Sequence, residues 1–525
     1  MVCAWADAET GYRRDQNTFV VRVGDGSVEL EWVSGSTFRF CRRWGSAAGI
    51  GQPIGAEPQE VKVRELPGRL EFSTRYIQVS LERAGGRVVV RSMDGKRLLA
   101  DAGAPRRTGD VAVLEREWPA GEHFRGLGVK TGVDGVVSPG SAIATDRPFL
   151  MSSMGYGEYF RTPGQYLYEF GDRRRVVAPT GREVEYFFYY GPTPKEILEE
   201  HVTVAGGIKE FDWKDFRVTT RLPEGAVTVA WPAGSWGGLA EMLRCVMRAS
   251  YSAIVLPAVD VSAYSDAAEA IRKRAAEVMR FLPVVYSPRR SDSVQELVWL
   301  ERERLRLTPF LVSYVYEAQE RGFPLVRPLA MQYPKDAEAA KYEDEFLLGD
   351  ELLVAPIFGP QARRRVYLPM GIWTEWHTNR RYSGREVVEI EGAADWIPVF
   401  ARNGSIVPCG PIEPGEAMAV HYFPRLAAEF FLYEEGSGAL TQLHAAPAGD
   451  LLRLEVESAR GRSYEWVVHH VGRCQKASAG ELEYMEAASR DQLTEGRWWY
   501  DAKCGNLHIR TRVAAGTDHV IHVSF

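Results

Sequence analysis

Residues 1 to about 205 consist of short segments in which apolar and polar side chains alternate. Clear examples are Thr18–Val23, Ser27–Trp32, Tyr76–Leu81 and Arg87–Arg91. Turn-forming pairs such as Gly85-Gly86 and Asp94-Gly95 separate these segments. Alternation with a period of two and frequent turns is typical of an antiparallel β-sandwich. We expect this region to close with a strand at Glu185–Tyr190 and a helix over Thr193–His201 that has Pro194 in its first turn.

The pattern changes at Ala226–Trp231, a continuous apolar run of the kind found in buried parallel strands. Ser235 then precedes apolar residues at helical spacing and predicts a capped helix that contains Leu239, Met242, Leu243 and Val246. A second buried strand at Ala253–Val259 is followed directly by Asp260. This succession predicts a βαβ unit, and barrel enzymes place their chemistry just after the carboxyl ends of such strands.

Two more strands are expected in the centre of the chain, at Phe281–Tyr286 and Pro324–Leu329. Helices over 236–250, 265–280 and 293–321 should connect the four strands, and Pro309 should kink the last helix. Four strands joined by right-handed crossovers predict a parallel sheet that stays open. Residues 413–525 again alternate as strands do.

The composition narrows the function classes. The net charge of −6 does not indicate a protein that binds polyanions, so nucleic acid is not an expected partner. No apolar run approaches 18 residues, so a membrane is not an expected partner either. The six cysteines form no CxxC pair and no metal spacing, and no cofactor motif is present, so we expect no metal and no cofactor. Reduced thiols in a cytoplasmic protein without a signal peptide are the expectation, although a Cys474–Cys504 pair stays open. Scarce Asn and abundant Arg favour a thermophilic source or a GC-rich genome.

Three motifs of the first region resemble the N-terminal β-sandwich of glycoside hydrolase family 31, the α-glucosidase and α-xylosidase family. They are Gly126–Gly132 (GLGVKTG), Pro148–Gly157 (PFLMSSMGYG) and Tyr189–Glu196 (YYGPTPKE). Later segments resemble the end of the family's barrel and the β-domain after it, namely Arg302–Pro328, Phe346–Ile357 and Ile397–Pro408. In all, the resemblance covers about four-fifths of the chain.

The resemblance implies a multidomain, mostly β protein. We expect an N-terminal β-sandwich at 1–206, a truncated (β/α) barrel remnant at 207–334, a proximal β-domain at 335–412 and a distal β-sandwich at 413–525. The central interval is about half as long as a complete barrel of roughly 250 residues.

The residues that the family uses for catalysis are not found. The family's nucleophile is an Asp in a motif of the W-x-D-M-x-E kind, and no such motif occurs; Asp212 and Asp215 stand in the right chain order, but their flanks do not match. The acid/base turn reads Trp231-Pro-Ala-Gly-Ser235, without a carboxylate. Because a retaining glycosidase needs two carboxylates about 5–5.5 Å apart, we assign no catalytic residue.

Three residues are carbohydrate-binding candidates. Asp260 falls on the family's sugar-binding aspartate, or it caps the turn after its strand. Trp231 and Trp236 either stack on a sugar or pack against the barrel remnant. We expect Arg327 to form ion pairs inside the scaffold, and Asp344 and Glu345 to be surface charges.

Three functions follow from these residues. The first is a catalytically degenerate relative that acts as a carbohydrate-binding, regulatory or assembly protein, with an α-linked saccharide as ligand. The second is an active α-glycosidase, of α-glucosidase or α-xylosidase type, whose relocated site pairs Asp260 with Asp212, Asp215 or Asp266. The third is a purely structural subunit. An open sheet leaves exposed edges, so we also expect a homo-oligomer or a complex with another subunit.

Overall fold

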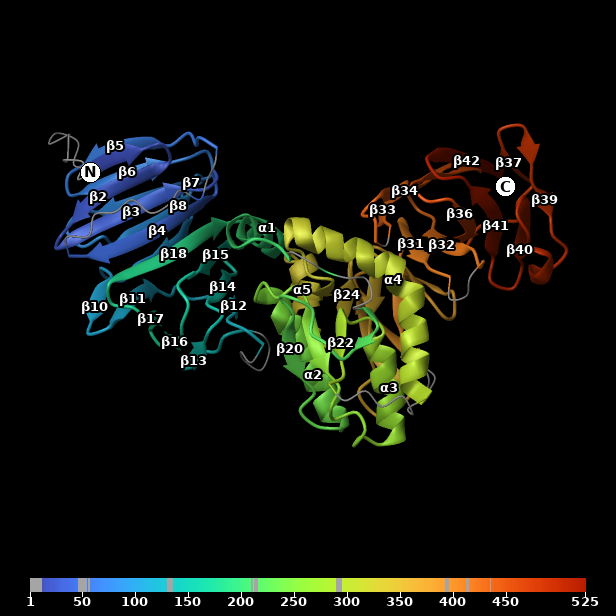
Figure 1. The fold of residues 1–525 in the computed structure, drawn as a ribbon, viewed down its shortest axis with the longest axis horizontal. Coiled ribbons are helices and arrows are strands. Elements are labelled where there is room, and N and C mark those ends of the chain that lie inside the picture. Colours follow the sequence, from blue (N-terminus) through green and yellow to red (C-terminus); the bar gives the residue numbers. More distant parts are fainter. Residues whose placement is uncertain are drawn as a thin grey trace. The chain divides into compact units, whose positions relative to one another are not determined.

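The computed structural model describes residues 12–45, 54, 57–129, 136–208, 211, 216–288, 295–391, 396–411, 415–434 and 436–525. The chain falls into two units. One contains Met1–Gly207 with Arg248–Ile254, and the other contains Ile208–Met247 with Val255–Phe525. Figure 1 shows the elements of both units.

The described residues up to Gly207 form three antiparallel sheets and one helix. The largest sheet has the order β1 (Tyr12–Asp15), β2 (Thr18–Val23), β3 (Gly26–Trp32), β4 (Thr37–Trp44), β18 (Glu183–Tyr190), β15 (Tyr156–Tyr159), β14 (Phe149–Ser152) and β12 (Phe124–Gly126). The second has the order β5 (Lys62–Leu66), β6 (Arg69–Ser73), β7 (Ile77–Glu82), β8 (Val88–Ser92) and β9 (Arg97–Ala100). The third has the order β10 (Arg106–Thr108), β11 (Val111–Glu117), β17 (Arg173–Ala178), β16 (Tyr166–Phe170) and β13 (Ala142–Thr145).

One hydrophobic core joins the three sheets, and side chains of β3, β7 and β17 all belong to it. The predicted antiparallel strands of this region are therefore confirmed, and β2 has the predicted bounds. The predicted helix is α1 (Pro194–Ala205), which begins with a capping box between Thr193 and Glu196.

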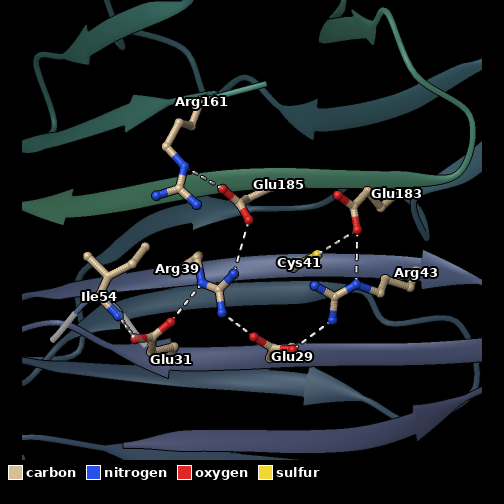
Figure 2. A network of polar contacts seen from close by, with 9 residues as sticks. All are labelled: Glu29, Glu31, Arg39, Cys41, Arg43, Ile54, Arg161, Glu183 and Glu185. Carbon is tan, nitrogen blue, oxygen red and sulfur yellow. Dashed lines mark hydrogen bonds and ion pairs between the residues drawn. The ribbon is translucent and has the colours of Figure 1, made fainter. Parts of the chain in front are cut away.

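The opposite face of the large sheet carries a buried network of charges, shown in Figure 2. Successive strand residues point to opposite faces, so Phe38 and Phe40 of β4 enter the core whereas Arg39 lies in the network. Arg39 pairs with Glu31 at 2.8 Å, with Glu185 of β18 at 3.0 Å, and with Glu29. Arg43 continues the network to Glu29 at 2.7 Å and to Glu183 at 2.9 Å, and Arg161 pairs with Glu185 at 3.0 Å. Ion pairs therefore link β3, β4 and β18.

A four-stranded parallel sheet opens the second unit (Figure 1). Its order is β19 (Val218–Thr219), β22 (Val284–Tyr286), β21 (Pro257–Asp260) and β20 (Val227–Ala230), and its edge strands β19 and β20 are not paired with each other. The helices α2 (Trp236–Tyr251) and α3 (Glu269–Met279) connect β20 to β21 and β21 to β22. The prediction of an open parallel sheet is confirmed for the described residues, and three of its four strands lie where the pattern indicated.

The fourth predicted strand is present, but its predicted place in the parallel sheet was wrong. The segment predicted at Pro324–Leu329 forms β23 (Val326–Pro328), which pairs antiparallel with β24 (Phe346–Leu348) in the next sheet. Its place in the parallel sheet is taken by β19, whose Val218 is aligned with Val285. A short buried strand has the same continuous apolar pattern in either kind of sheet, so the pattern could not separate them.

Helix α4 (Gln295–Arg321) packs on α3 and on strands of the C-terminal sheets. Phe310 stacks on Phe430 with ring centroids 5.7 Å apart, and Tyr316 stacks on Tyr433 at 4.3 Å. Pro309 lies inside this helix, and the backbone N–H of Gly410 donates to the carbonyl of Arg306 at 2.7 Å, one turn before the proline. The helix therefore connects the parallel sheet to the sheets that follow it.

Short elements follow helix α4. They are α5 (Leu329–Gln332), the 3₁₀ turn Ala339–Lys341, and a sheet of β23 (Val326–Pro328), β24 (Phe346–Leu348), β25 (Leu352–Val354), β30 (Val399–Arg402), β27 (Ile372–Glu375) and β28 (Arg381–Ser383). A two-stranded sheet of β26 (Arg363–Leu368) and β29 (Glu386–Glu391) shares its core.

The predicted internal role of Arg327 is confirmed, since this buried side chain pairs with Asp350 at 2.5 Å and with Glu317. The prediction that Glu345 is a surface charge was wrong: Glu345 is buried, 3.4 Å from Arg364.

Two six-stranded sheets complete the second unit. One has the order β31 (Ser405–Cys409), β32 (Met418–Phe423), β36 (Arg462–Val468), β41 (Asn506–Val513), β40 (Arg497–Asp501) and β39 (Met485–Glu486). The other has the order β33 (Ala428–Tyr433), β34 (Leu440–Ala448), β35 (Leu451–Ser458), β42 (Thr517–Ser524), β37 (Lys476–Ala479) and β38 (Leu482–Glu483). A 3₁₀ turn at Arg490–Gln492 lies between β39 and β40.

Cys474 and Cys504 are both free thiols, so the disulfide that the sequence left open is not formed. In the described part of the chain, no helix combines the length and the apolarity needed to cross a lipid bilayer. The domain boundaries at 206, 334 and 412 stay predictions.

Candidate functional site

The carboxyl edge of the parallel sheet brings the ends of three strands into one row. Ala230 of β20 is aligned with Asp260 of β21, and Asp260 is aligned with Tyr286 of β22. Trp231 and Ser287 are the next residues after β20 and β22. The predicted candidates Asp260 and Trp231 therefore come from neighbouring strands at the same edge.

Asp260 is half-buried and holds the turn that follows its strand. Its Oδ1 accepts hydrogen bonds from the backbone N–H of Ser262 at 2.9 Å and from the Ser262 hydroxyl at 2.6 Å. Such a bond from an aspartate to the backbone two residues later is an Asx turn. The Asp260 Oδ2 has no hydrogen-bond partner among the described residues, so a ligand hydroxyl can donate to it while the turn stays intact.

Trp231 is buried, with 4% of its surface exposed. Its ring meets Tyr264 edge to face, with the centroids 6.0 Å apart. The indole Nε1 is buried and has no hydrogen-bond partner in the described part of the chain. Buried tryptophan N–H groups usually have an acceptor, so this indole is an exception among the described residues, and its N–H is buried away from the surface.

Trp236 is the first residue of α2 and is half-buried. The helix starts there because the Ser235 hydroxyl accepts a hydrogen bond from the Gly238 N–H at 3.1 Å. The predicted apolar stripe of this helix is confirmed, since Leu239, Met242, Leu243 and Val246 are all fully buried. The turn after β20 thus places Trp236 at the amino end of α2, five residues after Trp231.

The carboxylates considered for hydrolysis differ in position. Asp266 is exposed in the loop after β21, where the Ser265 hydroxyl donates to its Oδ1 at 3.4 Å. Asp212 and Asp215 lie outside the described residues. Of the residues that end the four described parallel strands, Asp260 alone carries a carboxylate. The described residues also contain no group of three or more His, Cys, Asp and Glu side chains that could hold a metal ion.

Arg304 of α4 fixes the opposite, amino edge of the sheet, and the sequence analysis did not identify it. Its buried guanidinium donates to the carbonyls of Met279 at 2.8 Å, Leu282 at 2.7 Å and Pro283 at 2.9 Å, and to that of Phe216. Phe216 and Pro283 precede the neighbouring strands β19 and β22, so one side chain holds both strand starts. The sequence contained one signal for the buried role of this arginine: it lies four residues after Leu300, on the side of α4 that is buried.

Comparison with known proteins gives a family match and a shared fold. Residues 322–407 match the family model described as "Glycosyl hydrolase family 31 C-terminal domain". Alpha-glucosidase 2 of Bacillus thermoamyloliquefaciens is 31% identical over 175 residues, which cover 32% of this chain and 22% of that protein. The alpha-glucosidase of Saccharolobus solfataricus is 34% identical over 128 residues, which cover 24% and 17%. The matches thus span about a fifth of these relatives.

The solved structure of a GH31 dextranase from Flavobacterium johnsoniae aligns with 98% of this chain and 99% of its own, with a TM-score of 0.83 and 16% identity. At this identity, the alignment shows that the two proteins share their fold.

Proposed function

We propose that this chain acts on α-linked saccharides as an α-glycosidase, because residues 322–407 match the C-terminal domain model of glycoside hydrolase family 31 and α-glucosidases match parts of the chain. The substrate is an α-glucoside or an α-xyloside, and it binds at the carboxyl edge of the parallel sheet. The observation that carries this proposal is Asp260, a carboxylate at the end of β21 with an oxygen free of partners among the described residues. The α-glucosidase relatives favour this active alternative over a degenerate relative.

In the proposed reaction, one carboxylate attacks the anomeric carbon while a second carboxyl group protonates the departing oxygen. Water then cleaves the glycosyl ester, and the second group takes up the proton of the water. Asp260, at the end of its strand, is one of these two carboxyl groups. Asp266, or Asp212 or Asp215, supplies the other one.

A second candidate function is saccharide binding without hydrolysis, in a regulatory or assembly role. It is favoured by the single carboxylate that the described strand ends provide, because displacement at the anomeric carbon needs two. A turn that is closed by one carboxylate oxygen, while the other oxygen has no partner among the described residues, is sufficient to accept a hydrogen bond from a sugar hydroxyl group.

The decisive experiment measures aglycone release from aryl α-glucosides and α-xylosides, together with calorimetric binding of maltose and isomaltose. We expect turnover that is lost in Asp260→Asn and kept in Asp518→Asn, a control on an exposed position of β42. Saccharide binding that needs Asp260, without turnover in the unaltered protein, would establish the second function instead. If neither turnover nor binding is detected, both proposals are wrong and the structural-subunit hypothesis is preferred.

A further inference from the structure

A cavity of about 750 Å³ lies in the second unit, away from the carboxyl edge of the parallel sheet. One wall is the sheet that contains β32, β36 and β41, which contribute His421, Glu465, His508 and Arg510. The facing wall includes Arg280 and Phe281, which come just before β22, and Glu303 and Arg306 of α4. Ligand cavities have volumes of about 300–1,000 Å³, so this one can hold a small metabolite.

The alternation of the strands explains why polar groups line this cavity. On β41, His508 and Arg510 face the cavity, while Ile509 between them is fully buried on the other face. On β36, Glu465 faces the cavity and Trp466 is buried on the other side. The cavity is therefore a built feature of the sheet face.

Among the described lining residues, cationic groups outnumber carboxylates. Four guanidinium groups, those of Arg280, Arg306, Arg490 and Arg510, face three carboxylates, those of Glu303, Glu416 and Glu465. Glu465 is already neutralised, since Arg490 pairs with it and His508 lies 3.0 Å away. Burial acts to raise the pKa of Glu465, but the hydrogen bonds from His508 and Arg490 outweigh burial and lower it. Glu465 is thus a bound counter-ion and does not compensate further arginines.

Two of these arginines carry buried donors without acceptors. The Nε of Arg280 and the Nε of Arg510 have no hydrogen-bond partner in the described part of the chain. The contacts of Arg280 to Glu277 and Glu303 are long, at 3.5 and 3.7 Å, and Arg510 reaches only the Leu493 carbonyl, at 3.5 Å. The two Nε atoms are buried beneath the surface of the cavity, but the terminal nitrogens of both side chains have only these long polar contacts among the described residues. An anion in the cavity that accepts hydrogen bonds from the terminal nitrogens would therefore bind favourably.

Aromatic groups supply the apolar part of the lining. Trp376 borders the cavity, and its ring lies 4.8 Å from that of His421. Burial lowers the pKa of His421 to about 4, so this imidazole is neutral near pH 7 and adds a polar edge without charge. We propose that this cavity binds a small organic anion, whose carboxylate or phosphate group contacts Arg510 and Arg280 and whose carbon skeleton packs on Trp376.

The test is isothermal titration calorimetry of the full chain in low-salt buffer, because salt screens such contacts. The probes are glucose 6-phosphate, citrate, inorganic phosphate and glucose. Removing one charge-assisted contact should weaken anion binding by about tenfold or more in Arg510→Met. Arg306→Met, on the facing wall and half exposed, should weaken it as well. Arg512→Met is the matched control, since it lies on the same face of β41 but outside the lining.

Each outcome decides the proposal. Binding of glucose 6-phosphate and phosphate, or of citrate alone, supports it and identifies the anionic group. Equal binding of glucose, unchanged affinity in Arg510→Met, or no anion binding at millimolar concentration would overturn it. Circular dichroism checks the folding of Arg510→Met, and Arg306→Met keeps the test valid if that variant does not fold. Asp260→Asn should bind the anion normally, which separates this proposal from the saccharide site.

Discussion

Replacing Arg304 by Met should release the amino edge of the parallel sheet. The guanidinium donates to four backbone carbonyls, which belong to the start of β19, the end of α3 and the start of β22. Burial lowers the pKa of Arg304 to about 9, so the group is still protonated at pH 7. Methionine has a similar length but no donor, so all four carbonyls would lose their partner while the packing volume changes little.

The expected loss of stability is about 4 kcal/mol. A net contribution of about 1 kcal/mol for each of four hydrogen bonds gives this value. Since each 1.36 kcal/mol is about a factor of ten, the opening of these strands should become about a thousandfold more frequent.

Hydrogen–deuterium exchange with mass spectrometry measures this opening directly. The amide of Ser287 donates to the Thr219 carbonyl at 2.8 Å and reports on the pairing of β19 with β22. Arg302→Met, on the exposed side of the same helix, is the control and should change stability by less than about 0.5 kcal/mol. An exchange rate at Ser287 within threefold of the unaltered protein in Arg304→Met would refute the assigned role of the four carbonyls.

Arg39→Met should destabilise the first unit by about 3–5 kcal/mol, because it leaves buried glutamates without their cation (Figure 2). Calorimetry checks this loss of stability, with Arg64→Met at an exposed position as the control, and an equal effect of the two substitutions would contradict it. Burial lowers the pKa of His201 to about 3, so below pH 6.5 the unfolded chain binds more protons than the folded chain. The free energy of unfolding should therefore fall by about 2 kcal/mol as the pH is lowered from 7 to 5. In urea titrations, His201→Phe should flatten this pH profile, and an unchanged slope would count against the assignment. Burial raises the pKa of Glu345 to about 8, so the free energy of unfolding should fall as the pH rises from 4.5 through 8. At pH 9, Glu345→Gln should be more stable than the unaltered protein by about 1 kcal/mol or more, and the reverse order would disprove this.

The pattern of the first 205 residues was sufficient to predict several of their strands, because local rules decide them. Gly24, at φ 52°, makes the turn that ends β2, and the Thr193 capping box begins α1. Both signals lie within a few residues of the element that they limit.

The errors concern contacts between distant parts of the chain. Strand β19 has two residues, too few for any pattern, and it exists because β22 pairs with it. Glu345 is buried beside Arg364, which comes nineteen residues later in the chain. Arg304 interrupts the apolar stripe of α4, and its acceptors are carbonyl groups, which every sequence position carries. Hence side-chain identity alone could not reveal the role of Arg304.

The strand register limits how the proposed hydrolysis of a glycoside could take place. Neighbouring strands lie about 4.8 Å apart, so a carboxylate beside Asp260 on an adjacent strand would be near the 5–5.5 Å that a retaining reaction needs. The aligned neighbours of Asp260 are Ala230 and Tyr286, which supply no carboxylate. The second group must therefore come from a segment outside these strands, and Asp266 is the described candidate nearest in sequence. If the protein is hydrolytic, aglycone release should fall at least a hundredfold in Asp260→Asn and also in one variant among Asp266→Asn, Asp212→Asn and Asp215→Asn. Activity that survives all four substitutions would show that the reaction does not take place at this edge.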